Sequence, residues 1–402
     1  MDAKWHELRN KFAVDLYQAL SKSSTQNIIM SPAGLKIILT TVLHGARGVT
    51  AGEIAEVLDF PEHKKYFADY QSLIPNFEKH LLTITTQIFI ENTYCISPDF
   101  QSFVNEFLLS DIHSIDLKNQ AKSVEEINDW VVKCSKQEIN GLFPFVLVSS
   151  VIFKPHSKYK FLKSETLTMP FYVKPNLIVG AEMMILREKR FCTMKSRKLG
   201  AQIIEMPFAE SKLSMVIILP KKSDGLEDIE SKLGSVDLAQ ELSELWLSKV
   251  NLYLPKFKLE QTIEMNDILS KIGMPTAFTD KANFSGISTS QSLTISCVIH
   301  KVLFEVQEAG INICEETERR GVVDYPLLLS VRKMDYCNTV LAGGRQLSVA
   351  CVSKEARGDV PDVNTSNAIK CSTPDHSFIV LMNPSKNITK MNEKIYKIKN
   401  IN

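Results

Sequence analysis

The chain has 402 residues, 44% of them hydrophobic, and can bury a large core in either one domain or two. Forty-seven basic and 46 acidic residues give a net charge of +1, so no nucleic acid or membrane partner is expected. No apolar run is long enough to span a bilayer, and the first residues lack a signal peptide. A cytoplasmic protein is therefore expected, and an extracellular protein that is leaderless or has lost its leader is the alternative.

Helical patterns dominate the first third of the chain. An amphipathic opening helix is predicted by apolar residues at helical spacing, namely Trp5, Leu8, Phe12, Leu16 and Leu20. A short strand at 27–30 leads to Ser31 and Pro32, which form an N-cap followed by proline at the first helical position. They predict a helix over 33–43.

Further helices and strands follow from local signals. Thr50 and Glu53 have the spacing of a capping box and predict the start of another helix. Strands are predicted at 83–90 and 112–117, with a helix at 124–136. Segments rich in Val, Ile, Leu and Phe predict later strands at 146–153, 201–206, 213–219 and 249–254. Helices first and long strands later indicate an α+β fold.

Residues 322–373 differ from the rest of the chain. They mix short apolar pieces with polar runs and show no stable periodicity. The segment is predicted to be a long exposed loop or a disordered insertion. An unusual splice form is the alternative.

Catalytic motifs are absent from the sequence. It contains no GxSxG, HExxH, phosphate-binding loop or dinucleotide fingerprint. The eight histidines and eight cysteines are dispersed, without the spacing of metal ligands. The protein is therefore not expected to be an enzyme or to hold a metal or cofactor.

Separated motifs over about residues 5–310 carry a family resemblance. In chain order they are 27–32 (NIIMSP), 44–50 (HGARGVT), 127–131 (INDWV), 205–208 (EMPF), 254–257 (LPKF), 283–288 (NFSGIS), His300-Lys301 and Glu308-Ala309-Gly310. In this order and spacing the chain resembles the serpins, a family of serine protease inhibitors.

The resemblance implies a serpin fold over a single domain, residues 1–402, with three β-sheets and about nine helices. An exposed reactive-centre loop lies within residues 311–373. In this family, cleavage lets the loop insert into the central sheet, which drags the acylated protease along and distorts its active site. The implied partner is a serine protease or a cysteine protease, and the chain is expected to be a monomer.

The resemblance also implies three groups of site residues. They are the loop hinge (Glu308, Ala309, Gly310, Ile311, Asn312 and Ile313), the shutter of the central sheet (Ser31 and His300) and the reactive bond, Asp324-Tyr325. An aspartate at the bond suits a protease with acidic preference, such as a granzyme or caspase, and an arbitrary loop aspartate is the alternative. For His300, a hydrogen-bonding gate to Ser31 and a satisfied core histidine both remain open.

The hinge departs from the small, uncharged residues that the family favours. Insertion would bury alternate side chains. One phase buries Ile311, Ile313, Glu315 and Thr317, and the other buries Asn312, Cys314, Glu316 and Glu318. Either phase buries a carboxylate, which is costly unless the group is protonated. Inhibition is therefore expected to be slow or absent, and a non-inhibitory binding or carrier protein, or a decaying paralogue, is the alternative.

Other positions also depart from the family pattern. Gly34 stands where a second shutter serine is common, and Ser149 or Ser150 replaces an asparagine under the sheet opening. The C-terminal "HPF" strand becomes HSF at 376–378, and the usual closing strand is not found in 388–402. A basic cluster could bind heparin or nucleic acid, although a solvated hairpin is the preferred interpretation; it comprises Arg187, Lys189, Arg190, Lys195, Arg197 and Lys198.

Overall fold

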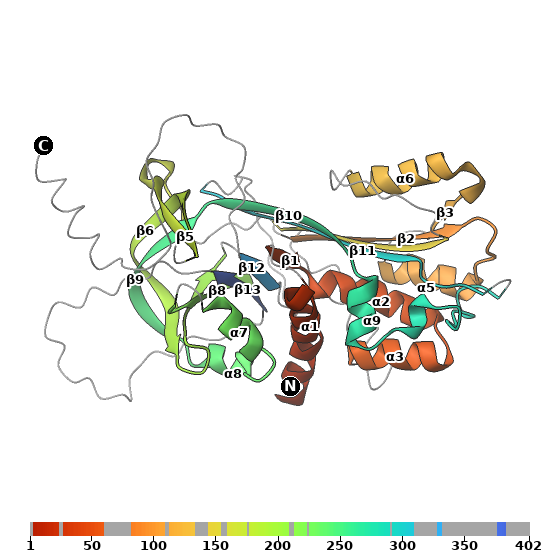
Figure 1. Ribbon diagram of the computed structural model, residues 1–402, viewed down its shortest axis with the longest axis horizontal. Coiled ribbons are helices and arrows are strands. Elements are labelled where there is room, and N and C mark those ends of the chain that lie inside the picture. The colour runs from red at the N-terminus through yellow and green to blue at the C-terminus, as the bar shows by residue number, and fades with distance from the viewer. Residues whose placement is uncertain are drawn as a thin grey trace, which may run out of the picture.

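The computed structural model describes twelve segments of the chain. They are residues 3–23, 27–59, 82–108, 112–132, 144–153, 159–174, 177–208, 213–222, 225–289, 292–308, 328–331 and 376–382. These residues form eight α-helices and two hydrogen-bonded sheets (Figure 1). The predicted α+β fold is confirmed. No helix among the described residues is long and apolar enough to cross a membrane.

Helices cover both faces of the smaller sheet, and α7 and α8 lie beside the larger sheet (Figure 1). In full, the helices are α1 (Ala3–Ser23), α2 (Pro32–Gly45), α3 (Gly48–Leu58), α5 (Pro98–Leu108), α6 (Gln120–Val132), α7 (Leu226–Lys232), α8 (Leu238–Ser243) and α9 (Asn266–Ile272). Figure 1 shows α2, α3, α5 and α9 beneath this sheet and α6 above it. Helix α2 is buried along almost its whole length, so its N-terminus meets the sheet directly.

The five-stranded sheet has the order β10–β11–β4–β2–β3. Its strands are β10 (Phe257–Glu264), β11 (Cys297–Val306), β4 (Phe145–Phe153), β2 (Leu82–Glu91) and β3 (Ile112–Ile115). The pairs β4–β11 and β2–β3 are parallel, and the other pairs are antiparallel. Both β4 and β11 are buried over most of their length, as expected for parallel strands covered on both faces.

The larger sheet has the order β1–β12–β13–β8–β7–β6–β5, with β9 also paired to β6. Its strands are β1 (Ile28–Met30), β12 (Leu328–Val331), β13 (His376–Met382), β8 (Leu213–Pro220), β7 (Ala201–Pro207), β6 (Leu177–Ser196), β5 (Leu167–Lys174) and β9 (Trp246–Pro255). Strand β6 is 20 residues long. It pairs with β5 over residues 177–183, with β9 over 183–193 and with β7 over 192–196. The described residues therefore form two hydrogen-bonded sheets, where three were expected.

The capping box predicted at Thr50 and Glu53 is wrong. Helix α3 starts at Gly48, before Thr50, and Thr50 is buried. The Thr50 hydroxyl oxygen accepts a hydrogen bond from the backbone N–H of Asn283 (3.0 Å). The Glu53 carboxylate accepts hydrogen bonds from the backbone N–H (2.9 Å) and hydroxyl (2.7 Å) of Thr276. Contacts with a distant segment have replaced the local cap.

Part of the segment predicted as a long loop is a strand. Residues Leu328–Val331 form β12, which pairs antiparallel with β1 and parallel with β13. The loop prediction therefore does not hold for these four residues, because their backbone groups are paired on both sides. The remainder of 311–373 lies outside the described residues.

Candidate functional site

The parallel ladder between β4 and β11 lies inside the five-stranded sheet, with β2 and β10 on its outer sides. It runs without interruption from the pair Cys297–Val146 to the pair Phe304–Phe153. No further strand separates β4 from β11. A strand entering at this position must therefore break the ladder hydrogen bonds first.

Ser31 and His300 meet where α2 reaches this ladder. Ser31 is the N-cap of α2, and its hydroxyl oxygen accepts a hydrogen bond from the backbone N–H of Gly34 (3.2 Å). The backbone N–H of Ser31 donates to Nε2 of His300 (2.8 Å). His300 stands opposite Ser149 within the ladder. The two proposed shutter residues are thus in contact, through the backbone of Ser31 rather than its hydroxyl.

His300 is fully buried and uncharged at neutral pH. Burial lowers the pKa of His300 from its ordinary value of 6.5 to about 3, and the Ser149 backbone opposes this shift only in part. Because Nε2 accepts the Ser31 hydrogen bond, we assign the imidazole hydrogen to Nδ1. The Ser149 backbone lies near the imidazole, but no acceptor has good hydrogen-bonding geometry to Nδ1, and the buried hydroxyl of Ser149 has no partner either. The centre of the ladder therefore holds polar atoms that are only partly satisfied.

Gly34 and Ser149 fit each other as a pair. A Cβ added at Gly34 would lie 2.5 Å from Oγ of Ser149 and 2.9 Å from Cγ2 of Val151. Real Cβ atoms do not approach other atoms so closely, so residue 34 must be glycine while Ser149 keeps this position. The two departures from the family pattern are therefore linked: glycine at position 34 leaves free the space that the Ser149 side chain fills.

The first hinge residue, Glu308, is held by two side chains. Its carboxylate accepts a hydrogen bond from the Thr166 hydroxyl (2.8 Å) and pairs with the ammonium of Lys256 (3.1 Å). Burial raises the pKa of Glu308, but its own backbone, Thr166 and Lys256 together lower it below the ordinary value. Lys256 lies between β9 and β10, where the two sheets join. We refer to Glu308, Thr166 and Lys256 as the hinge latch.

Sequence reasoning missed Thr166 and Lys256. Lys256 belongs to the LPKF motif, which was used only for the family resemblance, and Thr166 carries no recognisable signal. Both contacts depend on residues separated by more than 50 positions from Glu308, so no local pattern indicates them. Among the described residues, no group of three or more His, Cys, Asp or Glu side chains could hold a metal ion.

Several predicted site residues lie outside the described part of the chain. They are Ala309, Gly310, Ile311, Asn312, Ile313, Asp324 and Tyr325, and the four hinge positions at 315–318. Residues 388–402, in which the usual closing strand was not found, lie outside it as well. The HSF motif begins β13, with His376 opposite Leu213 of β8. Strand β12 occupies the place between β13 and β1.

Comparison with known proteins gives one consistent result. The family model "Serpin (serine protease inhibitor)" matches residues 7–339. Serine protease inhibitor 42Dd of Drosophila melanogaster is 33% identical, over 83% of this chain and 95% of that protein. Human Serpin B3 is 30% identical, over 83% of this chain and 93% of that protein. The fold is also similar to thyroxine-binding globulin in complex with thyroxine (TM-score 0.71, 24% identity, 79% and 90% of the two chains).

The buried, neutral state of His300 predicts a pH-dependent stability. A histidine with a pKa of 6.5 when unfolded and about 3 when folded favours the unfolded state as pH falls below 6.5. By pH 5 this group should lower the free energy of unfolding by about 2 kcal/mol. Denaturant unfolding at a series of pH values between 8 and 4.5 measures this decrease in the free energy of unfolding. His300→Gln keeps an acceptor for Ser31 and should show a shallower pH slope; equal slopes in both proteins would contradict the prediction.

The pairing of Gly34 with Ser149 predicts a compensating double mutant. Gly34→Ser should destabilise the protein by about 1–3 kcal/mol, because the added Cβ overlaps Ser149 and Val151. Ser149→Gly in the same chain should recover part of this loss, because it removes the closer overlap while the one with Val151 remains. Gly52→Ser is the matched control, since a Cβ at Gly52 meets nothing within 4 Å and should change stability by less than about 0.5 kcal/mol. Additive single effects in urea unfolding would refute the proposed overlap.

The hinge latch predicts a measurable coupling between Glu308 and Lys256. Glu308→Gln and Lys256→Met should each lower stability, with a coupling free energy of about 1 kcal/mol, because the Glu308 side chain is 8% exposed and Lys256 is 33% exposed. The control is Glu182→Gln. Its carboxylate lies 4.0 Å from the same ammonium but is 65% exposed, so it should couple weakly or not at all. If Glu182 and Glu308 showed equal coupling free energies with Lys256, burial of the carboxylate would not be what strengthens the ion pair.

Proposed function

The chain belongs to the serpin family of serine protease inhibitors, and we propose that it inhibits a serine protease by presenting the loop that follows Glu308. The observation that carries the proposal is the closed β4–β11 ladder, with Ser31–His300 at its centre and the hinge latch beyond its end. This arrangement suits a sheet that accepts a strand only after the protease has cut the loop. Residues Ser31, His300 and Glu308 act as positioning residues in this proposal, since none of them touches the protease.

The hinge sequence sets the rate of trapping in this proposal. Either insertion phase places at least one of Glu315, Glu316 and Glu318 inside a sheet whose neighbouring strands, β4 and β11, are buried. A buried carboxylate without a partner must be protonated or it opposes folding by several kcal/mol. Insertion therefore competes poorly with hydrolysis of the acyl-enzyme. Most encounters are expected to release a cleaved chain, and a minority to end in a covalent complex.

We place the reactive bond at Asp324-Tyr325, by counting from the hinge. An aspartate on the acyl side of the bond suits a protease with acidic preference, such as a granzyme or, among cysteine proteases, a caspase. Only the 19 residues 309–327 separate Glu308 from the start of β12, and the bond lies near the end of that stretch. Cleavage there would leave β12 and β13 together on the C-terminal fragment.

A non-inhibitory binding or carrier protein is the second candidate. The hinge carboxylates favour it, because a chain that never inserts its loop is not selected for small hinge residues. The fold itself is compatible with such a role, since thyroxine-binding globulin, similar in fold only, was solved with thyroxine. Cleavage without insertion separates this candidate from the first.

Incubation with a panel of granzymes, elastase-like proteases and caspases tests the proposal. Wild type should give a small fraction of complex stable in SDS and a larger fraction of cleaved chain. The variant Glu315→Thr/Glu316→Ala/Glu318→Ala should raise the complex fraction several-fold, because no carboxylate then enters the sheet. The control variant removes three exposed carboxylates elsewhere in the chain, those of Glu125, Glu244 and Asp280.

The melting temperature after cleavage decides between the two candidates. Insertion of the loop should raise it well above that of the intact protein, since a further strand then completes the sheet. If no protease gives a complex with either protein, and cleavage leaves the melting temperature unchanged, the chain is non-inhibitory. The variant Asp324→Ala should abolish cleavage by proteases that need an acidic residue at the bond, and unchanged cleavage would place the bond elsewhere.

A further inference from the structure

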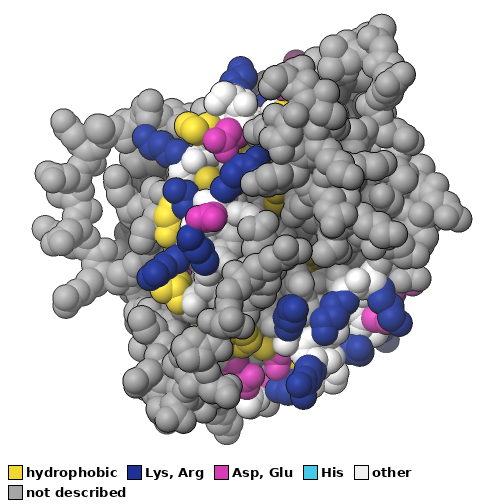
Figure 2. Space-filling view, turned by 90° about the vertical axis from the view of Figure 1, so that its left-hand side faces the viewer, with side chains coloured by type: hydrophobic (Ala, Val, Ile, Leu, Met, Phe, Trp, Pro, Cys, Tyr) yellow, Lys and Arg dark blue, Asp and Glu magenta, His cyan; other side chains and the backbone are white. Residues whose placement is uncertain are grey.

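Lys301 is a cation buried inside the β4–β11 ladder. Most Lys and Arg side chains of the described residues lie on the surface, as Figure 2 shows for one side of the molecule. Only two of them are buried, Lys36 of α2 and Lys301, which is 1% exposed. Lys301 stands opposite Ser150 of β4 and Thr262 of β10. It is therefore the one buried cation on a strand whose side chains the structure describes.

The ammonium of Lys301 has unused hydrogen-bonding capacity. Its Nζ lies 3.0 Å from Oε1 of Glu260, but the two groups are not aligned as a hydrogen bond, and Nζ has no other partner within the described residues. An ammonium has three N–H donors. Glu260 is also loosely held, because it lies on β10 at the edge of the five-stranded sheet and its side chain is 35% exposed. Lys301 can therefore bind a second carboxylate.

The ladder has two chemically different faces. On one face Phe304 of β11 stands opposite Phe153 of β4, and their fully buried rings are stacked with centroids 5.2 Å apart. Lys301 and Ser150 lie on the other face, because successive residues of a strand alternate between faces. A strand that enters the ladder therefore meets aromatic rings on one face, and an ammonium and a hydroxyl on the other.

The position of the loop in the sequence fixes the direction of an inserted strand. The loop follows β11, which ends at Val306. A loop that turns back between β4 and β11 runs antiparallel to both strands, since these are parallel to each other. The shortest hairpin turn has two residues and favours glycine, and Ala309-Gly310 provides such a turn. Ile311 would then stand opposite Glu308.

This register separates the hinge carboxylates. Glu315 would stand opposite Phe304 on the apolar face, and Glu318 would stand opposite Lys301. Glu316 lies two residues from Glu318 and shares its face. A three-residue turn would shift the strand by one residue and put both Glu316 and Glu318 on the apolar face. The two-residue turn is preferred because it brings one carboxylate to that face instead of two.

We propose that Lys301 is a positioning residue that receives the carboxylate of Glu318 when the cleaved loop enters the sheet, an inference that rests on the proposed function. Because Lys301 and Ser150 stand opposite each other, Glu318 would lie between an ammonium and a hydroxyl, both of which can donate to it. Glu260 is partly exposed and can turn to water when the new ion pair forms. Glu315, against the aromatic rings, is then the carboxylate that slows insertion.

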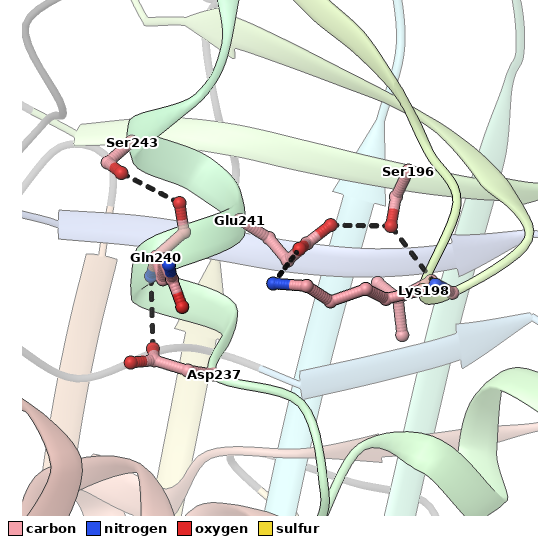
Figure 3. A network of polar contacts seen from close by, with 7 residues as sticks. Ser196, Lys198, Asp237, Gln240, Glu241 and Ser243 are labelled. Atoms are coloured by element: carbon pink, nitrogen blue, oxygen red, sulfur yellow. Dashed lines mark hydrogen bonds and ion pairs between the residues drawn. The ribbon is translucent and has the colours of Figure 1, made fainter.

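The same chain already holds a buried carboxylate in this way. Glu241 of α8 is 2% exposed, and its carboxylate accepts a hydrogen bond from the Ser196 hydroxyl and pairs with the ammonium of Lys198 (2.9 Å), as Figure 3 shows. A serine and a lysine therefore suffice to hold a carboxylate inside this fold. Ser150 and Lys301 present the same two groups to an entering strand.

Two matched substitutions test the inference on protein whose loop has been cut. Trypsin, which can cut after Arg319 or Arg320, opens the loop, and mass spectrometry verifies the cut. Glu315→Gln should raise the guanidinium midpoint of the cleaved protein, because it removes a charge from the apolar face. Glu318→Gln should lower that midpoint by at least about 0.2 M, because Lys301 loses its partner. The two changes are chemically identical and lie three residues apart, so each is the control for the other.

A double-mutant cycle assigns the effect to Lys301. In the cleaved protein, Lys301→Met should abolish the loss caused by Glu318→Gln and leave the gain from Glu315→Gln unchanged. The intact proteins are measured alongside, and the coupling should appear only after cleavage, which a merely structural role of Lys301 would not produce. If Lys301→Met does not fold, the opposite signs of the two glutamine variants decide, since both keep Lys301.

The protease panel gives a second readout. Glu315→Thr alone should raise the fraction of complex stable in SDS at least as far as the triple variant of residues 315, 316 and 318, because the triple variant also removes the partner of Lys301. A clear excess of complex with the triple variant would contradict the pairing of Glu318 with Lys301.

Three further results would overturn the inference. The first is any pattern other than a rise for Glu315→Gln and a fall for Glu318→Gln. The second is a loss in Glu318→Gln that persists beside Lys301→Met, and the third is that cleavage raises the midpoint of no variant. Failure of the proposed function is distinguishable from these: no protease of the panel then gives a complex stable in SDS, while the two cleaved glutamine variants still differ in sign.

Discussion

The direct pairing of β4 with β11 is the interaction on which the rest of the structure depends. It closes the five-stranded sheet. Both strands are covered on their two faces, so their backbone N–H and C=O groups can hydrogen-bond only to each other and not to water. Helix α2 begins at its centre, where Ser31 contacts His300, and Glu308 is held just after the end of β11. Adding a strand between β4 and β11 would therefore require both contacts to break or rearrange.

The two contacts differ in physical kind. The Ser31–His300 bond is fully buried and involves a backbone donor, so it depends on the position of α2 more than on the side chain at residue 31. The hinge latch is an ion pair near the surface, and solvent weakens it. The ion pair at the end of the ladder is therefore expected to break more easily than the buried contact at its centre. That order agrees with the proposed insertion of the loop from the hinge.

The hinge carboxylates bear on the proposed inhibition. Insertion of the loop between β4 and β11 would place at least one of them between two buried strands, where a carboxylate without a partner is costly.

The sequence by itself determined the family, the α+β class and the type and approximate bounds of most helices and strands, because periodicity and ordered motifs are local properties of the chain. It also pointed to Ser31, His300 and Glu308. Only the tertiary structure decided that the Ser31 contact is a backbone one, that Gly34 and Ser149 share one space, that Lys256 and Thr166 hold Glu308, and that residues 328–331 form a strand. Likewise, the sequence showed the basic run 187–198, whereas only folding placed the turn at 197–200 beside Lys221. Electrostatic and packing forces depend on distance in space, which sequence separation does not measure.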